Sequence, residues 1–81
     1  MEVTVLFFAS LRSLTGMKQM QLSLPEGTKL GELFARLAEK FPDLGGRRAQ
    51  MVLAVNGEGR GDGHLLADHD EVALLPPVSG G

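Results

Sequence analysis

The residues of this sequence that could do chemistry are its last two, Gly80 and Gly81. Because glycine has no Cβ, a terminal Gly-Gly can enter a slot too narrow for other residues and present its α-carboxylate to another protein's active site. The apolar run Val72–Leu75 leads to this end through Pro76-Pro77, which lack backbone donors and favour an extended exit. The pattern predicts that residues 78–81 form a tail bound by another protein. Simple fraying of a chain end is the alternative.

Two other clusters suggest chemistry that their spacing does not support. The glycine-rich segment Gly57–Gly63 is not followed by Gly-Lys-Ser/Thr or by a helical pattern, so we interpret it as a connector and not as a phosphate loop. The next segment holds four residues of metal-ligand types: His64, Asp68, His69 and Asp70. Their spacing matches no zinc or calcium pattern, and a turn accounts for them, so we predict no metal site.

The composition sets limits on the class of protein. The 81 residues suit one small domain. A net charge of −2 and only four Phe as aromatic residues argue against nucleic-acid binding, and the absence of cysteine excludes disulfides and thiolate catalysis. No apolar run reaches the roughly 20 residues that span a membrane. The first apolar run is broken at Ser10 and Arg12 and has no basic region before it, so we expect a cytoplasmic protein without a signal peptide.

The elements that must position the tail begin with a predicted hairpin. Glu2–Ala9 is rich in β-branched and aromatic residues and is typical of a strand. The segment Ser10–Gly16 is expected to be a loop that can include one helical turn, closed by Gly16. Met17–Leu24 then alternates apolar and polar residues, which predicts a half-buried strand. A short connection makes the two strands antiparallel.

One amphipathic helix follows, over Lys29 to Lys40 or Phe41. Thr28 is the expected N-cap, with its hydroxyl bound to a free amide of the first turn. Pro42 ends the helix because it disfavours the helical conformation in the residue before it. Apolar residues with helical spacing form a single stripe, which we assign to the core: Leu30, Leu33, Phe34, Leu37 and Phe41.

The rest of the chain completes a single sheet. Asp43–Gln50 is predicted to be a polar loop, Met51–Val55 a buried strand and Asn56-Gly57 a turn, and Glu71 begins the last strand. The order strand, strand, helix, strand, strand predicts an α+β fold: a β-grasp (ubiquitin-like) domain over residues 1–77, in which one main helix packs across a mixed sheet. The first and last strands are expected to pair in parallel at its centre.

With this order and the tail in view, the chain resembles a known family. It is similar to the small subunit of molybdopterin synthase, a ubiquitin-like sulfur carrier. The likeness covers nearly the whole length, and the terminal segment is its most specific part. It is carried by Val5–Ala9, Leu11-Arg12, Thr15-Gly16, Ala54–Asn56 and Asp70–Gly81.

The resemblance implies a chemistry for the terminus. An ATP-using activating enzyme, similar to the E1 class, adenylates the Gly81 carboxylate, and sulfur then replaces one oxygen to give a thiocarboxylate. The tail enters the large catalytic subunit of molybdopterin synthase and donates sulfur to a cyclic pyranopterin monophosphate. The carrier is then a non-catalytic subunit that holds no cofactor or metal of its own. The resemblance assigns five residues to the bound tail: Pro77, Val78, Ser79, Gly80 and Gly81.

Partners in such families also contact the sheet beside the tail. The outward-facing set Leu6, Phe8, Ala73 and Leu75 is the candidate interface, because an exposed apolar patch often marks one. Packing of these side chains under loops is the alternative. One departure from the family concerns the turn before the last strand, which has His69 where the family usually has glycine. A left-handed conformation costs histidine more than it costs glycine.

Other functions are compatible with the same residues. The chain could serve as a sulfur carrier for thiamine or cysteine synthesis, although carriers for the thiazole pathway tend to lack the Leu-Pro-Pro-Val run of residues 75–78. A ubiquitin-like protein modifier, joined through Gly81 to lysines of target proteins, is a further alternative. The last is a β-grasp interaction module with an inert tail.

Overall fold

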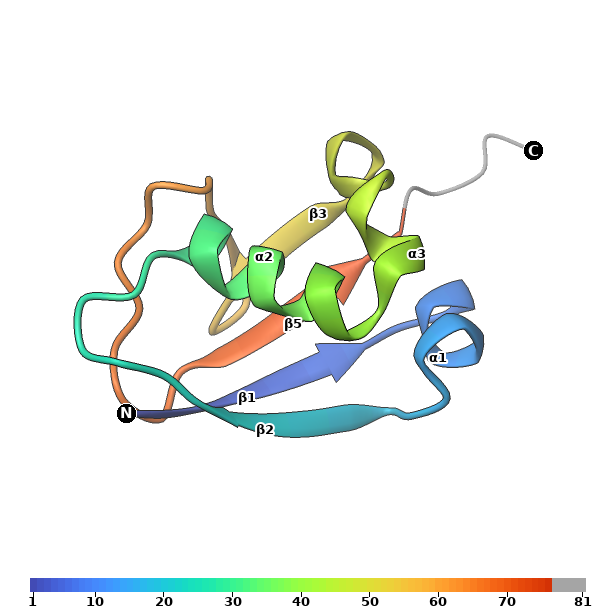
Figure 1. Ribbon diagram of the computed structural model, residues 1–81. Coiled ribbons are helices and arrows are strands. Elements are labelled where there is room, and N and C mark those ends of the chain that lie inside the picture. Colours follow the sequence, from blue (N-terminus) through green and yellow to red (C-terminus); the bar gives the residue numbers. More distant parts are fainter. Residues whose placement is uncertain (77–81) are drawn as a thin grey trace.

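A computed structural model describes residues 1–76, which form a five-stranded mixed sheet with helix α2 across one face (Figure 1). In chain order the elements are β1 (Glu2–Phe7), α1 (Ser10–Thr15), β2 (Gln19–Ser23), α2 (Leu30–Lys40), α3 (Pro42–Gly45), the 3-10 turn η1 (Arg48–Gln50), β3 (Val52–Val55), β4 (Glu58–Gly59) and β5 (Glu71–Leu75). The strand order is β2-β1-β5-β3-β4. Among the strand pairs of residues 1–76, β1 and β5 pair in parallel at the centre, and the other pairs are antiparallel. The predicted α+β β-grasp fold is confirmed.

The core lies between α2 and one face of the two central strands. Alternation along β1 and β5 places one set of apolar side chains under the helix, and the helix contributes its predicted stripe. Phe7 packs edge-to-face against Phe41 with ring centroids 5.9 Å apart. The completely buried members of this core, each with at most 1% of its surface exposed, are Val3, Val5, Phe7, Leu30, Leu33, Leu37, Leu44, Leu53, Val72 and Leu74.

The start of α2 differs from the sequence prediction. Thr28 is not the N-cap: its hydroxyl donates to the carbonyl oxygen of Pro25 at 2.7 Å, and the helix begins two residues later at Leu30. The Leu30 amide donates to the carbonyl oxygen of His64 at 2.8 Å. The Gly31 amide donates to the carbonyl oxygen of Asp62 at 2.9 Å, and because these two carbonyl groups accept from first-turn amides, no hydroxyl cap is needed there.

Two segments predicted to be loops contain short helices. Ser10–Gly16 forms α1, which ends at Gly16 with φ of 78°, a left-handed conformation that glycine adopts without steric cost. Asp43–Gln50, predicted to be a polar loop, contains α3 and η1. Leu44 is the physical reason for α3, since its side chain is completely buried, and Pro42 occupies a first-turn position that suits proline.

The predicted turn at Asn56-Gly57 is confirmed and joins a strand that the sequence reading missed. Both residues have positive φ, 51° and 85°, and Val55 pairs with Glu58 across this two-residue connection. Such a turn matches the twist of an antiparallel hairpin. The segment Gly57–Gly63 is therefore not only a connector, because its first part forms edge strand β4.

Candidate functional site

The predicted carrier terminus follows β5 at one end of the sheet. Because β1 and β5 are parallel, both strands finish at this end, beside α1 and α3 (Figure 1). The last described residue is Pro76, which is half-buried. The tail residues predicted to enter a partner, Pro77, Val78, Ser79, Gly80 and Gly81, lie outside the described residues, and their role stays a prediction.

The four predicted interface residues belong to the sheet face that α2 does not cover. Leu6 and Ala73 are direct partners in the β1–β5 register and alternate with completely buried neighbours. Leu75 continues this face along β5, and Phe8 follows β1 directly. All four side chains are half-buried, so each keeps apolar surface at the exterior. We name Leu6, Phe8, Ala73 and Leu75 the open-face patch, and its binding role stays a prediction.

The sequence reading missed a fifth apolar residue of this face. Val52 pairs with Leu75 in the β3–β5 register, so both side chains point to the same side of the sheet. Val52 is 55% exposed, whereas its neighbour Leu53 is 1% exposed. Alternation within the predicted strand Met51–Val55 would have found it, because placing Leu53 in the core requires Val52 to face outward.

An arginine from α1 holds the edge of the open-face patch. The Arg12 Nε donates to the carbonyl oxygen of Phe7 at 3.0 Å. Its guanidinium carbon lies 5.6 Å from the centre of the Phe8 ring, a cation–π distance. The backbone turns between them at Ala9, which has φ of 50°. Phe8 is therefore an anchored aromatic surface with a cation above it, at the end of the sheet where β5 also finishes.

At the opposite end of the sheet, Asp70 fixes β5 in register with β3. Its Oδ1 accepts from Asn56 Nδ2 at 2.9 Å, and its Oδ2 accepts from the Ala67 amide at 2.7 Å. The amide of Glu71 donates to Asn56 Oδ1 at 3.0 Å. The carboxylate and amide groups of this turn thus satisfy backbone and side-chain donors and set where β5 begins.

Asp68 in the same turn holds the start of β1. Its Oδ1 accepts from the Glu2 amide at 2.7 Å, and this hydrogen bond, aided by His69 and the chain's amino terminus, keeps the pKa of the Asp68 carboxyl below its usual value. His69 has φ of 68°, the left-handed conformation expected for this position. Within residues 1–76, no three His, Cys, Asp or Glu side chains are grouped so that they could hold a metal ion.

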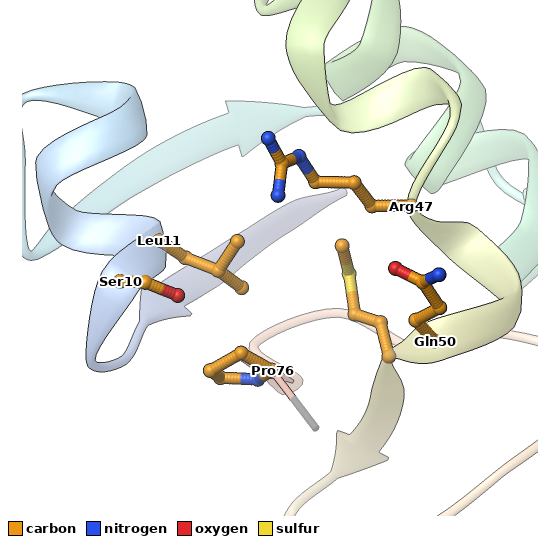
Figure 2. A pocket seen from close by; sticks show the side chains of 6 residues that line it. Ser10, Leu11, Arg47, Gln50 and Pro76 are labelled. Carbon is orange, nitrogen blue, oxygen red and sulfur yellow. The ribbon is translucent and has the colours of Figure 1, made fainter. Parts of the chain in front are cut away.

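A small pocket completes the end of the sheet from which the chain leaves. It has a volume of about 130 Å³, and Figure 2 shows side chains from three segments converging on it. Because Pro76 forms one wall, this pocket is part of the surface that surrounds the chain's exit. The residues that line it are Ser10, Leu11, Arg47, Gln50, Met51 and Pro76.

A ubiquitin-like β-grasp sheet, with an apolar open face next to the exit of its last strand, defines the structural class. The chain belongs to the ThiS family, whose model matches residues 5–81. It is 40% identical to the molybdopterin synthase sulfur carrier subunit of Arabidopsis thaliana, over 99% of this chain and 83% of that protein. The predicted resemblance to molybdopterin synthase small subunits is confirmed by such relatives.

Solved structures agree with this assignment. SAMP1 from Haloferax volcanii superposes with a TM-score of 0.90 at 27% identity, covering 100% of both chains. A chain in the complex of subunits 1 and 2 of the molybdopterin-converting factor from Helicobacter pylori gives a TM-score of 0.71 at 26% identity, again covering 100% of both chains. In the part of this chain that the structure describes, no helix has the length and apolar character needed to cross a membrane.

Proposed function

We propose that this chain is the sulfur carrier subunit of a molybdopterin synthase and that the Gly81 carboxylate is its working group. The observation that carries the proposal is the central parallel pair, which brings the end of β5 beside the open-face patch, in a chain related over nearly its whole length to such carriers. A partner that binds this patch is therefore close to the point from which the terminal segment continues. The chain itself has no cysteine, so the sulfur must be carried on the terminus.

The chemistry begins with activation of a poor electrophile. A carboxylate oxygen of Gly81 attacks the α-phosphorus of ATP, the bond to pyrophosphate breaks, and an acyl adenylate forms. Sulfur at the oxidation level of sulfide, as HS⁻, then attacks the carbonyl carbon, and AMP leaves as the C–S bond forms. The product is a thiocarboxylate, a nucleophilic sulfur on a tether, so its delivery within a bound complex is effectively intramolecular.

Two partners follow from this sequence of reactions. The large catalytic subunit would bind the thiocarboxylate tail and pass the sulfur to a cyclic pyranopterin monophosphate, and the two-subunit complex from Helicobacter pylori supports a partner of this kind. The activating partner is an E1-like adenylyltransferase. ATP belongs to that enzyme and not to the carrier, which needs no cofactor. Because activation consumes ATP, we place the reaction in the cytoplasm.

The proposed tail assigns a role to each of its last residues. Pro77 and Val78 would span the distance from the sheet to the partner's opening, and Ser79 would lie at its mouth. Gly80 and Gly81 would enter the narrow channel, because residues without a Cβ allow the partner's backbone to approach closely. The open-face patch would supply the apolar contact beside this channel.

Reconstitution with the large subunit tests the function. Two equivalents of thiocarboxylated chain, mixed with the large subunit and cyclic pyranopterin monophosphate, should supply the two sulfur atoms of the dithiolene product. A chain with one residue appended after Gly81 should fold normally yet fail to be activated, because its terminal carboxylate is displaced from the adenylation site. Full activity of the extended chain would contradict the proposal.

A second candidate is a ubiquitin-like protein modifier. The likeness to SAMP1 favours this function, because SAMP1 stands for small archaeal modifier protein 1. The same acyl adenylate would then react with a lysine amine and release AMP, leaving an isopeptide bond. Mass spectrometry of tryptic peptides from cells expressing the tagged chain would identify lysines that carry its terminal residues. Absence of such peptides, together with sulfur transfer, would favour the carrier function.

A further inference from the structure

The pocket at the exit of the chain has an apolar floor and a charged rim. Leu11 and Met51, 2% and 6% exposed, form the floor, and Pro76 forms one wall. Figure 2 shows the Arg47 side chain reaching over this floor, with the Gln50 amide on the neighbouring wall. At about 130 Å³ the pocket is smaller than the roughly 300–1,000 Å³ of a typical small-molecule site. Its size fits one side chain better than a cofactor.

The Nε of Arg47 is hydrogen-bonded within the chain, and its two terminal guanidinium nitrogens are open in the part of the chain that the structure describes. Its Nε donates to the carbonyl oxygen of Asp43 at 3.0 Å, which orients the guanidinium. No ion pair to Arg47 occurs within residues 1–76, whereas the adjacent Arg48 is paired with Asp62 and lies 5.8 Å from the Phe34 ring centre. An oriented guanidinium with two open nitrogens suits a carboxylate, which it can bind through two parallel hydrogen bonds.

The charged residues among positions 1–76 are unevenly distributed along the sheet. Within these residues, the end where β1 and β5 finish carries more cations than anions, although the chain's net charge is −2. Its cations are Arg12, Lys18, Lys40 and Arg47, and its anions are Glu39 and Asp43. The opposite end, where both strands begin, carries the carboxylates of Glu2, Asp68, Asp70 and Glu71 together with the amino terminus of Met1. The exit end is therefore complementary to an acidic partner surface.

The pocket is also continuous with the interface that the proposed function requires. Five residues follow Pro76, and five residues of any chain span at most about 17 Å. A protein that holds Gly81 must therefore come close to the pocket wall that Pro76 forms. An acidic side chain that enters the pocket is therefore expected to belong to the protein that binds the tail, because that protein is held next to the pocket.

We propose that the pocket receives an Asp or Glu side chain of the large catalytic subunit, with the carboxylate bound by Arg47 and the methylene groups packed on Leu11 and Met51. This inference rests on the proposed function. A charged contact beside the tail orients the partner and raises the rate of encounter, while the open-face patch supplies most of the apolar contact. The pocket thus fixes how the large subunit sits around the tail.

The test is the dissociation constant of the large subunit for matched arginine variants of the full chain. Arg47→Glu should raise the dissociation constant at least tenfold, because a like charge replaces an attractive pair. Arg47→Lys, which keeps the charge but not the two-pronged geometry, should raise it less. Arg36→Glu is the control. Arg36 is an exposed residue of α2, and its substitution makes the same charge change away from the pocket.

The outcomes separate this inference from the proposed function. Normal binding of the unaltered chain with equal effects of Arg47→Glu and Arg36→Glu would overturn the inference alone. No binding of the unaltered chain would overturn both. Urea unfolding of each variant checks that the fold is intact, and Arg47→Gln replaces Arg47→Glu if the latter unfolds. Substituting surface acids of the large subunit by lysine should yield one variant that restores binding of Arg47→Glu, and failure of all of them would exclude a carboxylate occupant.

Discussion

The two faces of the central strand pair differ in how much apolar surface they bury. On the face beneath α2, Val5, Phe7, Val72 and Leu74 are 0% exposed. On the other face, the open-face patch comes from the same two strands and their ends, and its side chains are only half-buried. One face therefore stabilises the fold, and the other keeps the apolar surface to which we propose that a partner binds. Substitutions on the two faces should separate stability from binding.

The largest expected effect is a loss of folding stability, and it should differ between two neighbouring residues that face opposite sides of the sheet. Leu74→Ala should lower the free energy of unfolding by about 2–5 kcal/mol, because it leaves a cavity under α2. Leu75→Ala, on the open face, should lower it by about 1 kcal/mol, since a half-buried side chain loses less transfer energy. Urea unfolding followed by circular dichroism measures both values. Equal losses would show that the two faces are not distinct.

For binding of the partners, substitutions on the open face should have the larger effect. Phe8→Asp should weaken the complex with the large subunit by a factor of about 30 or more, the size typical of a lost aromatic anchor. We expect the same substitution to weaken the complex with the activating enzyme, because both proteins must reach the same tail. Titration calorimetry with each partner provides the measurement.

The control for this substitution is Leu65→Asp. Leu65 is also an exposed apolar residue, 59% exposed, but it pairs with Lys29 next to the start of α2, away from the open-face patch. It should leave both affinities unchanged. Loss of only one complex in Phe8→Asp would refute shared use of the patch, and equal effects of the two substitutions would refute the patch itself.

The smallest effect concerns the end of the sheet away from the exit. Asp68 has a lowered pKa in the folded chain, chiefly because it accepts a hydrogen bond from the Glu2 amide, so it adds stability above its usual pKa of 3.8. That stability is lost as the pH falls from there through the lowered folded-state pKa. Asp68→Asn should be slightly less stable than the unaltered chain at pH 7, and the difference should shrink below pH 3.8.

Unfolding curves at a series of pH values measure this difference. Because Asp68 lies at the opposite end of the sheet from the exit, affinity for the large subunit should not change. A difference in stability that grows as the pH falls would contradict the assigned hydrogen bond.

Much of the fold could be predicted because its signals are periodic and local. The apolar stripe of α2 and the alternation of β2 each repeat over several residues, and near-continuous apolar strands indicated that β1 and β5 pair at the centre. Asn56-Gly57 was recognised from the dipeptide alone, because few other residues tolerate positive φ at both positions.

The features that were missed depend on contacts between distant segments. Leu44 is one apolar residue in a polar stretch, and nothing local indicates that it reaches the core and supports α3. Thr28 has the right type for a cap, but the His64 carbonyl takes that place from far along the chain. β4 has only Glu58 and Gly59, residues with little tendency to form strands, and it exists because the turn places them beside β3.

The sequence predicted which residues belong to the candidate site better than it predicted how they are arranged in space. The open-face residues follow from alternation, although Val52 was overlooked in the same pattern. Arg47 and Arg48 lie within Asp43–Gln50, which was predicted only to be a polar loop. Sequence spacing could not reveal that one arginine is bound to Asp62 while the other lines the pocket beside Pro76.

The most direct test of the central claim is the intact mass of the chain after incubation with its activating enzyme, ATP and a sulfur source. A chain lacking Gly81 provides the control. We predict a mass gain equal to replacement of one oxygen by sulfur in the full chain and none in the control. No gain in the full chain, or the same gain in both, would contradict the assignment of Gly81 as the residue that carries sulfur.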